Sequence, residues 1–300
     1  MAADNLPRLC FIGFGEAGQA LASGLQEAGV KTQAAWDILF PEAAGERLRE
    51  AARTLGVRQA ASAADAVAGA DIVIAAVTAA SSFEAAKTAK SHLRPNQFYL
   101  DVNSVSPGRK QETAKLLQDV ARYVDVAIMA PVHPAKHKTP LLLAGEHAET
   151  IEPIMRGLEM KTSIAGPEIG AAAAIKMVRS VMIKGLEALC MECFLAASRA
   201  GVEEQIVASL SKSYPGVDWP KVVAYNLERM ASHGARRAAE MEEVADTLHE
   251  LGVEPMMTAG TIARQREMGK IGKIDAVRAV LDKGHTQILH AVSKAASDRH

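Results

Sequence analysis

The 300-residue sequence has few aromatic residues, at 4%, and almost no net charge, at −1. Proteins whose main partner is nucleic acid usually carry a strongly basic patch, and single-strand binders add aromatic side chains on which bases stack. No segment of this chain is strongly basic. We therefore expect no nucleic-acid partner.

Cysteine is also scarce, since the chain contains only Cys10, Cys190 and Cys193. The last two form a single CxxC within an Ala- and Leu-rich helical pattern. A redox CxxC is expected beside a βαβ unit, and a zinc site needs further Cys or His residues at suitable spacing. Neither accompanies this pair, so we predict three reduced, buried, structural cysteines and no metal site.

Long apolar runs are missing as well. The N-terminus, MAADNLPRLC, has no basic segment followed by an apolar run, so we expect no signal peptide. The longest apolar stretch, 170–183, contains Lys176 and Arg179, which argues against a membrane span. A reducing cytoplasm is the compartment consistent with these features.

The chain is nevertheless rich enough in apolar residues for a full core, with 49% hydrophobic and 23% charged residues. Its length suggests two domains. The first part alternates apolar runs with helical periodicity, and from Glu168 onward nearly every segment is helical. Strands are expected at 8–13, 32–36, 57–60, 71–77, 97–102, 124–130 and 141–144. Helices are expected at 17–28, 41–55, 82–93 and 107–123, with a further short helix that begins at Ser62. Such alternation implies a parallel sheet with right-handed crossovers.

A glycine-rich motif follows the first expected strand and opens the first expected helix. It fits GxGxxG and consists of Gly13, Phe14, Gly15, Glu16, Ala17 and Gly18. Gly13 permits a tight turn, Gly15 lets the backbone approach a pyrophosphate, and Gly18 lets helix and strand pack closely. The context predicts an α/β Rossmann domain with a doubly wound, mostly parallel sheet over 1–163 and an all-helical domain over 164–300. A glycine-rich turn that binds nothing is the alternative.

Asp37 ends the second expected strand, 19 residues after Gly18. An acidic residue at this distance accepts hydrogen bonds from the adenosine ribose and repels a 2′-phosphate, which favours NAD over NADP. Arg47 and Arg49 are close enough in sequence to reach back, so NADP remains an alternative cofactor. An ordinary turn aspartate is the other interpretation.

These residues resemble the β-hydroxyacid dehydrogenase superfamily, which includes 3-hydroxyisobutyrate and 6-phosphogluconate dehydrogenases. Four stretches carry the likeness in order: FIGFGEAGQALASGL at 11–25, DVNSVSP at 101–107, APV at 130–132, and Gly170 with Lys176 six residues later. The segment HGARRAAEMEEV resembles a 6-phosphogluconate-dehydrogenase-like branch.

The resemblance implies that Lys176 is the general acid/base. Lys176 interrupts an apolar helix, and Arg179, Ser180 and Lys184 follow on the same helical face. Neighbouring cations and burial should lower the pKa of Lys176, which would let its amine accept a proton. A solvated stripe on a surface helix is the alternative.

Polar residues also follow two expected strands, at the sheet edge where ligands bind in such folds. Asn103 and Ser104 are candidates for the nicotinamide ribose and the substrate, and Val77 and Thr78 for cofactor contacts. Small polar residues that merely cap a turn are the alternative.

Two departures from the family bear on the substrate. His133, Pro134 and Ala135 stand where the family has SGG, and Pro134 has no N–H with which to clamp a carboxylate. His133 is a candidate to bind the carboxylate in place of those N–H groups. A loop histidine with no role in binding is the alternative. Ser180 stands where the family has asparagine, beside Arg179, whose guanidinium suits an anionic group.

His233 and Arg236 lie near the start of a charged helical segment. The spacing of Arg236 and Glu240 suits a surface ion pair, which is the default interpretation. The resemblance implies instead that His233 and Arg236 bind the substrate's acid group, and that a homodimer forms.

The expected activity is therefore hydride transfer between NAD, or NADP, and a small acidic β-hydroxy acid, with or without decarboxylation. An imine or keto-acid reductase is an alternative within the superfamily. A non-catalytic NAD(H)-binding regulator is an alternative from another class, although it would not need Lys176.

Overall fold

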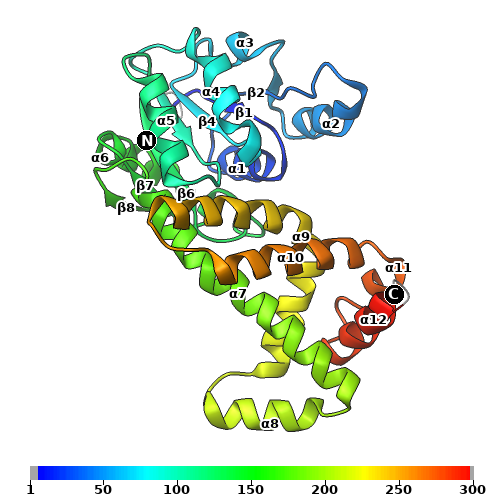
Figure 1. Ribbon diagram of the computed structural model, residues 1–300. Helices are drawn as coiled ribbons and strands as arrows, with labels where there is room; N and C mark the ends of the chain where they lie inside the picture. Colours follow the sequence, from blue (N-terminus) through cyan, green and yellow to red (C-terminus); the bar gives the residue numbers. More distant parts are fainter. Residues whose placement is uncertain (1–5, 298–300) are drawn as a thin grey trace. The chain divides into compact units, whose positions relative to one another are not determined.

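The computed structural model of the chain describes residues 6–297. Two compact units make up the chain, and the division between them falls after Met177. The first unit is an α/β domain and the second is helical, as the sequence predicts (Figure 1).

The first unit is built on one eight-stranded sheet with the strand order β3-β2-β1-β4-β5-β6-β7-β8. The strands are β1 (Leu9–Ile12), β2 (Gln33–Trp36), β3 (Arg58–Gln59), β4 (Ile72–Ala75), β5 (Phe98–Asp101), β6 (Arg122–Ile128), β7 (Leu141–Ala144) and β8 (Thr162–Gly166). Every neighbouring pair is parallel except β6 with β7, which is antiparallel. The strand order turns back at β1 and β4, and ligands bind at such a switch point in doubly wound sheets.

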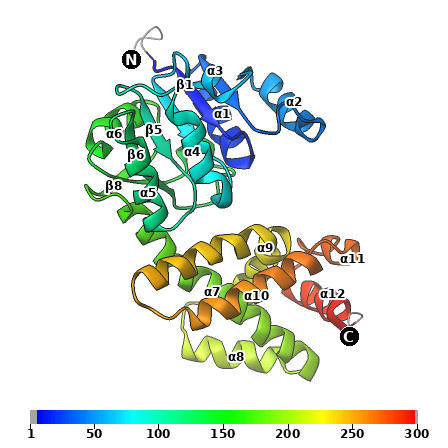
Figure 2. The ribbon, with the colours of Figure 1, turned by 45° about the horizontal axis from the view of Figure 1, so that its top comes forward.

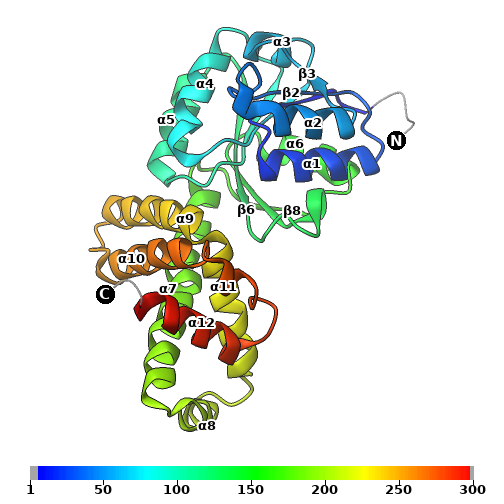
Figure 3. The same ribbon diagram turned by 90° about the vertical axis from the view of Figure 1, so that its right-hand side faces the viewer.

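Helices cover both faces of this sheet (Figure 3). They are α1 (Glu16–Glu27), α2 (Glu46–Thr54), α3 (Ala63–Val67), α4 (Ser82–Lys90), α5 (Pro107–Leu117) and α6 (Ala148–Gly157), with short 3-10 turns η2 (Ala43–Gly45), η3 (Ala79–Ser81) and η4 (Lys136–Lys138). Leu21 of α1 and Ile151 of α6 belong to one core cluster. Ala86 of α4 and Leu117 of α5 belong to the other. The central strands are buried on both faces, as their continuous apolar runs predict.

Three local features of the structure were not predicted: the end of α5, helix α6 and strand β8. The helix expected to reach residue 123 ends at Leu117, because the backbone turns at Asp119, which has a left-handed φ of 67°, and then enters β6. Helix α6 contains Pro153, and β8 is a half-exposed edge strand, so neither has the clear periodicity by which the other elements are recognised.

The second unit consists of helices that follow one another with short connections (Figure 2). They are α7 (Ala171–Ala200), whose first turns belong to the first unit, α8 (Glu203–Ser213), α9 (Trp219–Glu250), α10 (Met256–Ile271), α11 (Asp275–Arg278) and α12 (His285–Ser297). Helices α9 and α10 pack closely, since a Cβ at Gly234 would lie 2.3 Å from the carbonyl oxygen of Gln265. None of the helices within residues 6–297 is both long and apolar enough to cross a membrane.

The start of α7 explains why the division lies after Met177 rather than after residue 163. The backbone N–H groups of Gly170 and Ala173 donate to Asp125 of β6, at 3.1 and 3.2 Å. Ala172 is buried against Ala127 and Ala144 of the sheet. The first turns of α7 are therefore anchored to the strands.

The cysteines are all free, but they are not all buried. Cys10 and Cys190 are buried, whereas Cys193 is exposed, so the prediction for Cys193 is wrong. On this part of α7 the buried stripe includes Cys190, Met191 and Phe194, and Cys193 lies outside it. Helical periodicity alone did not show where this stripe ends.

Candidate active site

The glycine-rich loop lies between β1 and α1, and each of its glycines has a distinct geometric role. Gly13 has a φ of +90°, and a Cβ there would lie 2.4 Å from the carbonyl oxygen of Ala76. A Cβ at Gly18 would lie 2.8 Å from the carbonyl oxygen of Gly13. No atom lies within 4 Å of the position that a Cβ on Gly15 would take. The loop thus packs tightly on its own side and stays open above Gly15, which fits a dinucleotide pyrophosphate.

Asp37 follows β2 and faces this loop. One of its carboxylate oxygens accepts a hydrogen bond from the N–H of Phe14 at 2.8 Å, and the other from the N–H of Leu39 at 3.0 Å. Arg49 does not reach toward it, because its guanidinium binds the Glu46 carboxylate and donates to the carbonyl oxygen of Glu42 at 2.8 Å. This leaves a carboxylate beside the loop, as NAD binding requires.

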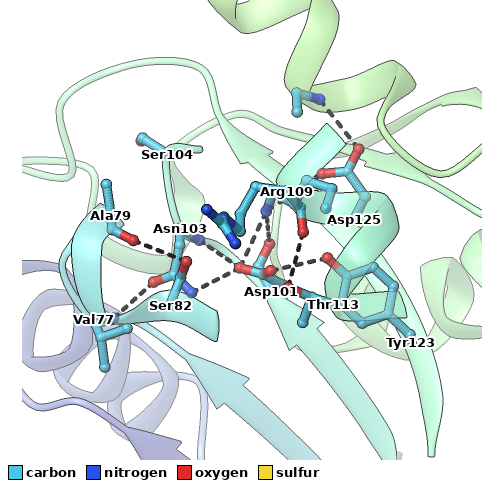
Figure 4. A network of polar contacts seen from close by, with 12 residues as sticks. Val77, Ala79, Ser82, Asp101, Asn103, Ser104, Arg109, Thr113, Tyr123 and Asp125 are labelled. Atoms are coloured by element: carbon cyan, nitrogen blue, oxygen red, sulfur yellow. Dashed lines mark hydrogen bonds and ion pairs between the residues drawn. The ribbon is translucent and has the colours of Figure 1, made fainter. Parts of the chain in front are cut away.

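The loops after β4 and β5 are joined through Asn103. Its side-chain oxygen accepts a hydrogen bond from the N–H of Val77 at 2.7 Å, and its side-chain nitrogen donates to Asp101 at 2.7 Å (Figure 4). Thr78, next to Val77, is exposed. The candidate cofactor contacts at Val77, Thr78 and Asn103 are thus adjacent at the carboxyl ends of neighbouring strands.

Lys176 and Ser104 come together in the first unit. The ammonium of Lys176, on the second turn of α7, donates to the hydroxyl oxygen of Ser104 at 2.5 Å. Both side chains are partly buried. The two positions lie 72 residues apart in the chain. The structure therefore joins the DVNSVSP loop to the helix that carries the candidate acid/base.

A buried ion network contacts both the loop of Ser104 and the start of α7. The ammonium of Lys110, on α5, donates to the carbonyl oxygen of Asp101 at 2.6 Å, and lies 3.1 Å from its carboxylate and 3.4 Å from that of Asp125. The Tyr123 hydroxyl donates to Asp101 at 2.9 Å (Figure 4). Burial, and then the two carboxylates, raise the pKa of Tyr123 well above its ordinary value.

Sequence reasoning missed this network, although signals for it were present. Asp125 interrupts the apolar strand β6, Asp101 ends the apolar strand β5, and the two residues pair in register across these strands. Ser106 caps α5 by accepting a hydrogen bond from the N–H of Arg109, which fixes the helix start at Pro107, three residues before Lys110. Which lysine would meet the two carboxylates depends on strand register, which the pattern does not specify.

The candidates that follow Lys176 on α7 have different environments within the second unit. Arg179 is exposed, whereas Ser180 and Lys184 are buried. Lys184 donates to the Ser180 hydroxyl at 3.2 Å and lies 3.3 Å from the Glu240 carboxylate. Burial is the main cause that lowers the pKa of Lys184. Of these three residues, Arg179 is therefore the one whose charged group is exposed and can meet an anion.

His133 lies in an exposed loop after β6, before Pro134. His233 and Arg236, on α9, line a groove of about 540 Å³ in the second unit together with Lys273 and Arg278. Arg236 also pairs with Glu240 along the helix, as its spacing predicts. Among the described residues that line this groove, none is acidic.

Comparison with known proteins agrees with this geometry. Residues 8–104 match a family described as NADP oxidoreductase coenzyme F420-dependent, and residues 197–268 match a domain of unknown function, DUF1932. An NAD-dependent L-serine dehydrogenase of Pseudomonas aeruginosa is 25% identical over 223 residues, which are 71% of this chain and 72% of that protein.

Two solved structures are similar over most of their length. A conserved hypothetical protein from Sinorhizobium meliloti is 34% identical, with a TM-score of 0.74 over 97% of each chain. A conserved protein of unknown function, described as structurally similar to 3-hydroxyacid dehydrogenases, is 33% identical, with a TM-score of 0.70 over 88% of this chain and 97% of its own. With its dinucleotide loop and helical second unit, the chain belongs to the β-hydroxyacid dehydrogenase superfamily of NAD(P)-dependent oxidoreductases.

Proposed function

We propose that this protein is an NAD-dependent dehydrogenase that interconverts a small acidic β-hydroxy acid and its carbonyl product. The contact between Lys176 and Ser104, in the same unit as the glycine loop, carries the proposal. The Pseudomonas relative is described as acting on L-serine, an acid with a hydroxyl on its β-carbon. The same class of substrate is proposed here.

In this proposal the loop 13–18 and Asp37 hold the dinucleotide, whose nicotinamide supplies the hydride acceptor when bound. Asn103, fixed by Val77 and Asp101, supports the nicotinamide ribose. Asp37, accepting from the loop N–H, is placed to favour NAD over NADP.

Lys176 has the role of general base in oxidation and of general acid in reduction. As a neutral amine it takes the proton of the substrate hydroxyl, and as an ammonium it returns that proton. The Ser104 hydroxyl orients the amine and is available to the substrate oxygen. In a reaction that includes decarboxylation, the β-keto acid formed by hydride transfer loses CO2, and the Lys176 ammonium is the proposed acid that protonates the α-carbon of the resulting enol.

We further propose that cationic side chains hold the acid group of the substrate. Arg179 is exposed on α7, and His233 and Arg236 line a groove free of acidic residues. Guanidinium groups pair with carboxylates in two-pronged geometry. Ser180 and His133 remain candidate substrate contacts.

The decisive experiment follows NADH formation with a panel of aldonates, 3-hydroxy amino acids and 2-alkyl-3-hydroxy acids. With the best substrate, Lys176→Met should lower kcat by about 10²- to 10⁴-fold, because acid/base catalysis contributes that much. Its NADH affinity, from fluorescence titration, should match that of the wild type. Lys115→Met, which removes an exposed lysine of α5, serves as the control.

Near-wild-type turnover of Lys176→Met would remove Lys176 from the mechanism. Silence of the wild type across the whole panel, together with tight NADH binding, would favour a regulatory NAD(H)-binding protein instead. Turnover of cyclic imines alone would favour an imine reductase.

We also propose that the protein is a homodimer. On α7 an apolar stripe of Val178, Met182, Leu186 and Leu189 is 43–64% exposed. Contiguous exposed apolar surface is unusual on a soluble monomer, and a helix stripe can pair with its own symmetry copy. Light scattering after size-exclusion chromatography should give twice the chain mass, and Met182→Lys should give a monomer. Met256→Lys, at an even more exposed methionine of α10, should leave the dimer intact.

A further inference from the structure

The first unit buries three charged side chains almost completely. Asp101 and Lys110 are 1% exposed and Asp125 is 0% exposed, so two negative charges meet one positive charge out of contact with water. Burying ions costs several kcal/mol each, and apolar residues of the same size often give a more stable protein. The cost of burying these charges therefore points to a role for the network other than stability.

Asp101 controls the loop that carries Ser104. One carboxylate oxygen accepts hydrogen bonds from the backbone N–H of Asn103 at 3.0 Å and from its side chain at 2.7 Å. The other oxygen accepts from the Tyr123 hydroxyl at 2.9 Å. Ser104 directly follows Asn103 in the chain. The hydrogen bonds between Asn103 and this carboxylate therefore orient the backbone that carries Ser104.

Asp125 controls the turn of α7 that precedes Lys176. Its carboxylate accepts hydrogen bonds from the N–H groups of Gly170 and Ala173, at 3.1 and 3.2 Å. Residues three apart lie on the same side of a helix, one turn on. Rotation or displacement of this first turn would therefore carry the Lys176 side chain with it.

Lys110 joins the two carboxylates. Its ammonium lies 3.1 Å from Asp101 and 3.4 Å from Asp125, which pair in register on β5 and β6. We propose that Asp101, Lys110 and Asp125 are positioning residues that hold Ser104 and Lys176 at their 2.5 Å contact. The expected effect of this positioning on turnover rests on the function proposed above. The expected effect on the geometry of Lys176 does not.

The structure offers a closely matched pair of variants. Tyr123→Phe removes one hydrogen bond to Asp101 and keeps the ring. Tyr99→Phe is the control, because Tyr99 pairs with Tyr123 in register and stacks on its ring, with 6.2 Å between the ring centroids. The buried hydroxyl that this change removes makes no hydrogen bond. Tyr123→Phe should lower kcat about 10- to 100-fold, since small misplacements of reacting groups cost that much, while the dissociation constant for NAD stays unchanged. Tyr99→Phe should leave both values unchanged.

A second measurement does not depend on catalysis. The rate at which acetic anhydride acetylates Lys176, read by mass spectrometry of the Lys176 peptide, reports how firmly the amine is held. Asp125→Asn loses the ion pair with Lys110 but keeps one acceptor oxygen, and should change this rate in the same direction as Ser104→Ala. Tyr99→Phe should keep the wild-type rate.

The outcomes separate the two proposals. A wild type without dehydrogenase activity whose Lys176 acetylation still responds to Asp125→Asn would overturn the proposed function and support positioning. Folded Tyr123→Phe and Asp125→Asn proteins with wild-type kcat and acetylation rates would overturn positioning. A kcat that falls only in step with the affinity for NAD would indicate general damage and would also overturn it.

Discussion

Replacing Lys110 with methionine should strongly destabilise the first unit. Methionine fills nearly the same volume, so the cost of an empty cavity is small. The ammonium lies 3.1 and 3.4 Å from the carboxylates of Asp101 and Asp125, all three side chains being at most 1% exposed. Removing one partner from a buried ion pair costs about 3 to 5 kcal/mol. Two carboxylates share the loss here, so we expect about 4 kcal/mol, or roughly a thousandfold in the folding equilibrium.

The two tryptophans allow this cost to be measured in the correct unit. Trp36 ends strand β2 of the first unit and Trp219 lies in the second, so a Trp219→Phe background leaves one fluorophore within the affected sheet. Urea unfolding followed by Trp36 fluorescence then gives the free energy of unfolding of Lys110→Met relative to its parent. Lys115→Met, at an exposed position on the same helix, should change it by less than about 0.5 kcal/mol. A loss below about 1 kcal/mol for Lys110→Met would refute the claim that this ammonium balances the buried carboxylates.

Three further predictions address the cofactor, the substrate and pH. Asp37→Ala should weaken NAD binding about tenfold and reduce the difference between the affinities for NAD and NADP, both measured by fluorescence titration. A parent protein that binds NADP more tightly than NAD would contradict the role assigned to Asp37. Arg179→Ala should raise KM for an acidic substrate about tenfold or more in steady-state kinetics, while an equal loss of NAD affinity would argue against substrate contact. Burial raises the pKa of the Cys10 thiol from its ordinary 9.0 to about 12, so the folded state keeps a proton that the unfolded chain loses. The free energy of unfolding of the wild type relative to Cys10→Ala should therefore fall by roughly 1 kcal/mol per pH unit between pH 9 and 12. Urea midpoints of the two proteins that change in parallel across this range would exclude this effect.

Much of the fold is legible in the sequence because its signals are local. Apolar runs and helical periodicity predict the strands β1 to β7 and most of the helices. The glycine motif, read with its flanking strand and helix, predicts a dinucleotide loop, and the φ of Gly13 and the space above Gly15 fit that prediction. Signals fail where an element is short or half-exposed, as in β8, and at the end of α5.

The amino-acid sequence alone is enough to predict the order of most elements, the glycine loop and the position of Lys176 as an unusual residue in an apolar helix. Folding in three dimensions brings Lys176 to Ser104, 72 residues away, and places Lys110 between Asp101 and Asp125. The physical reason is that such contacts depend on strand register and on how one helix start is anchored to the sheet. Short-range patterning constrains neither, since both arise only when distant segments pack together.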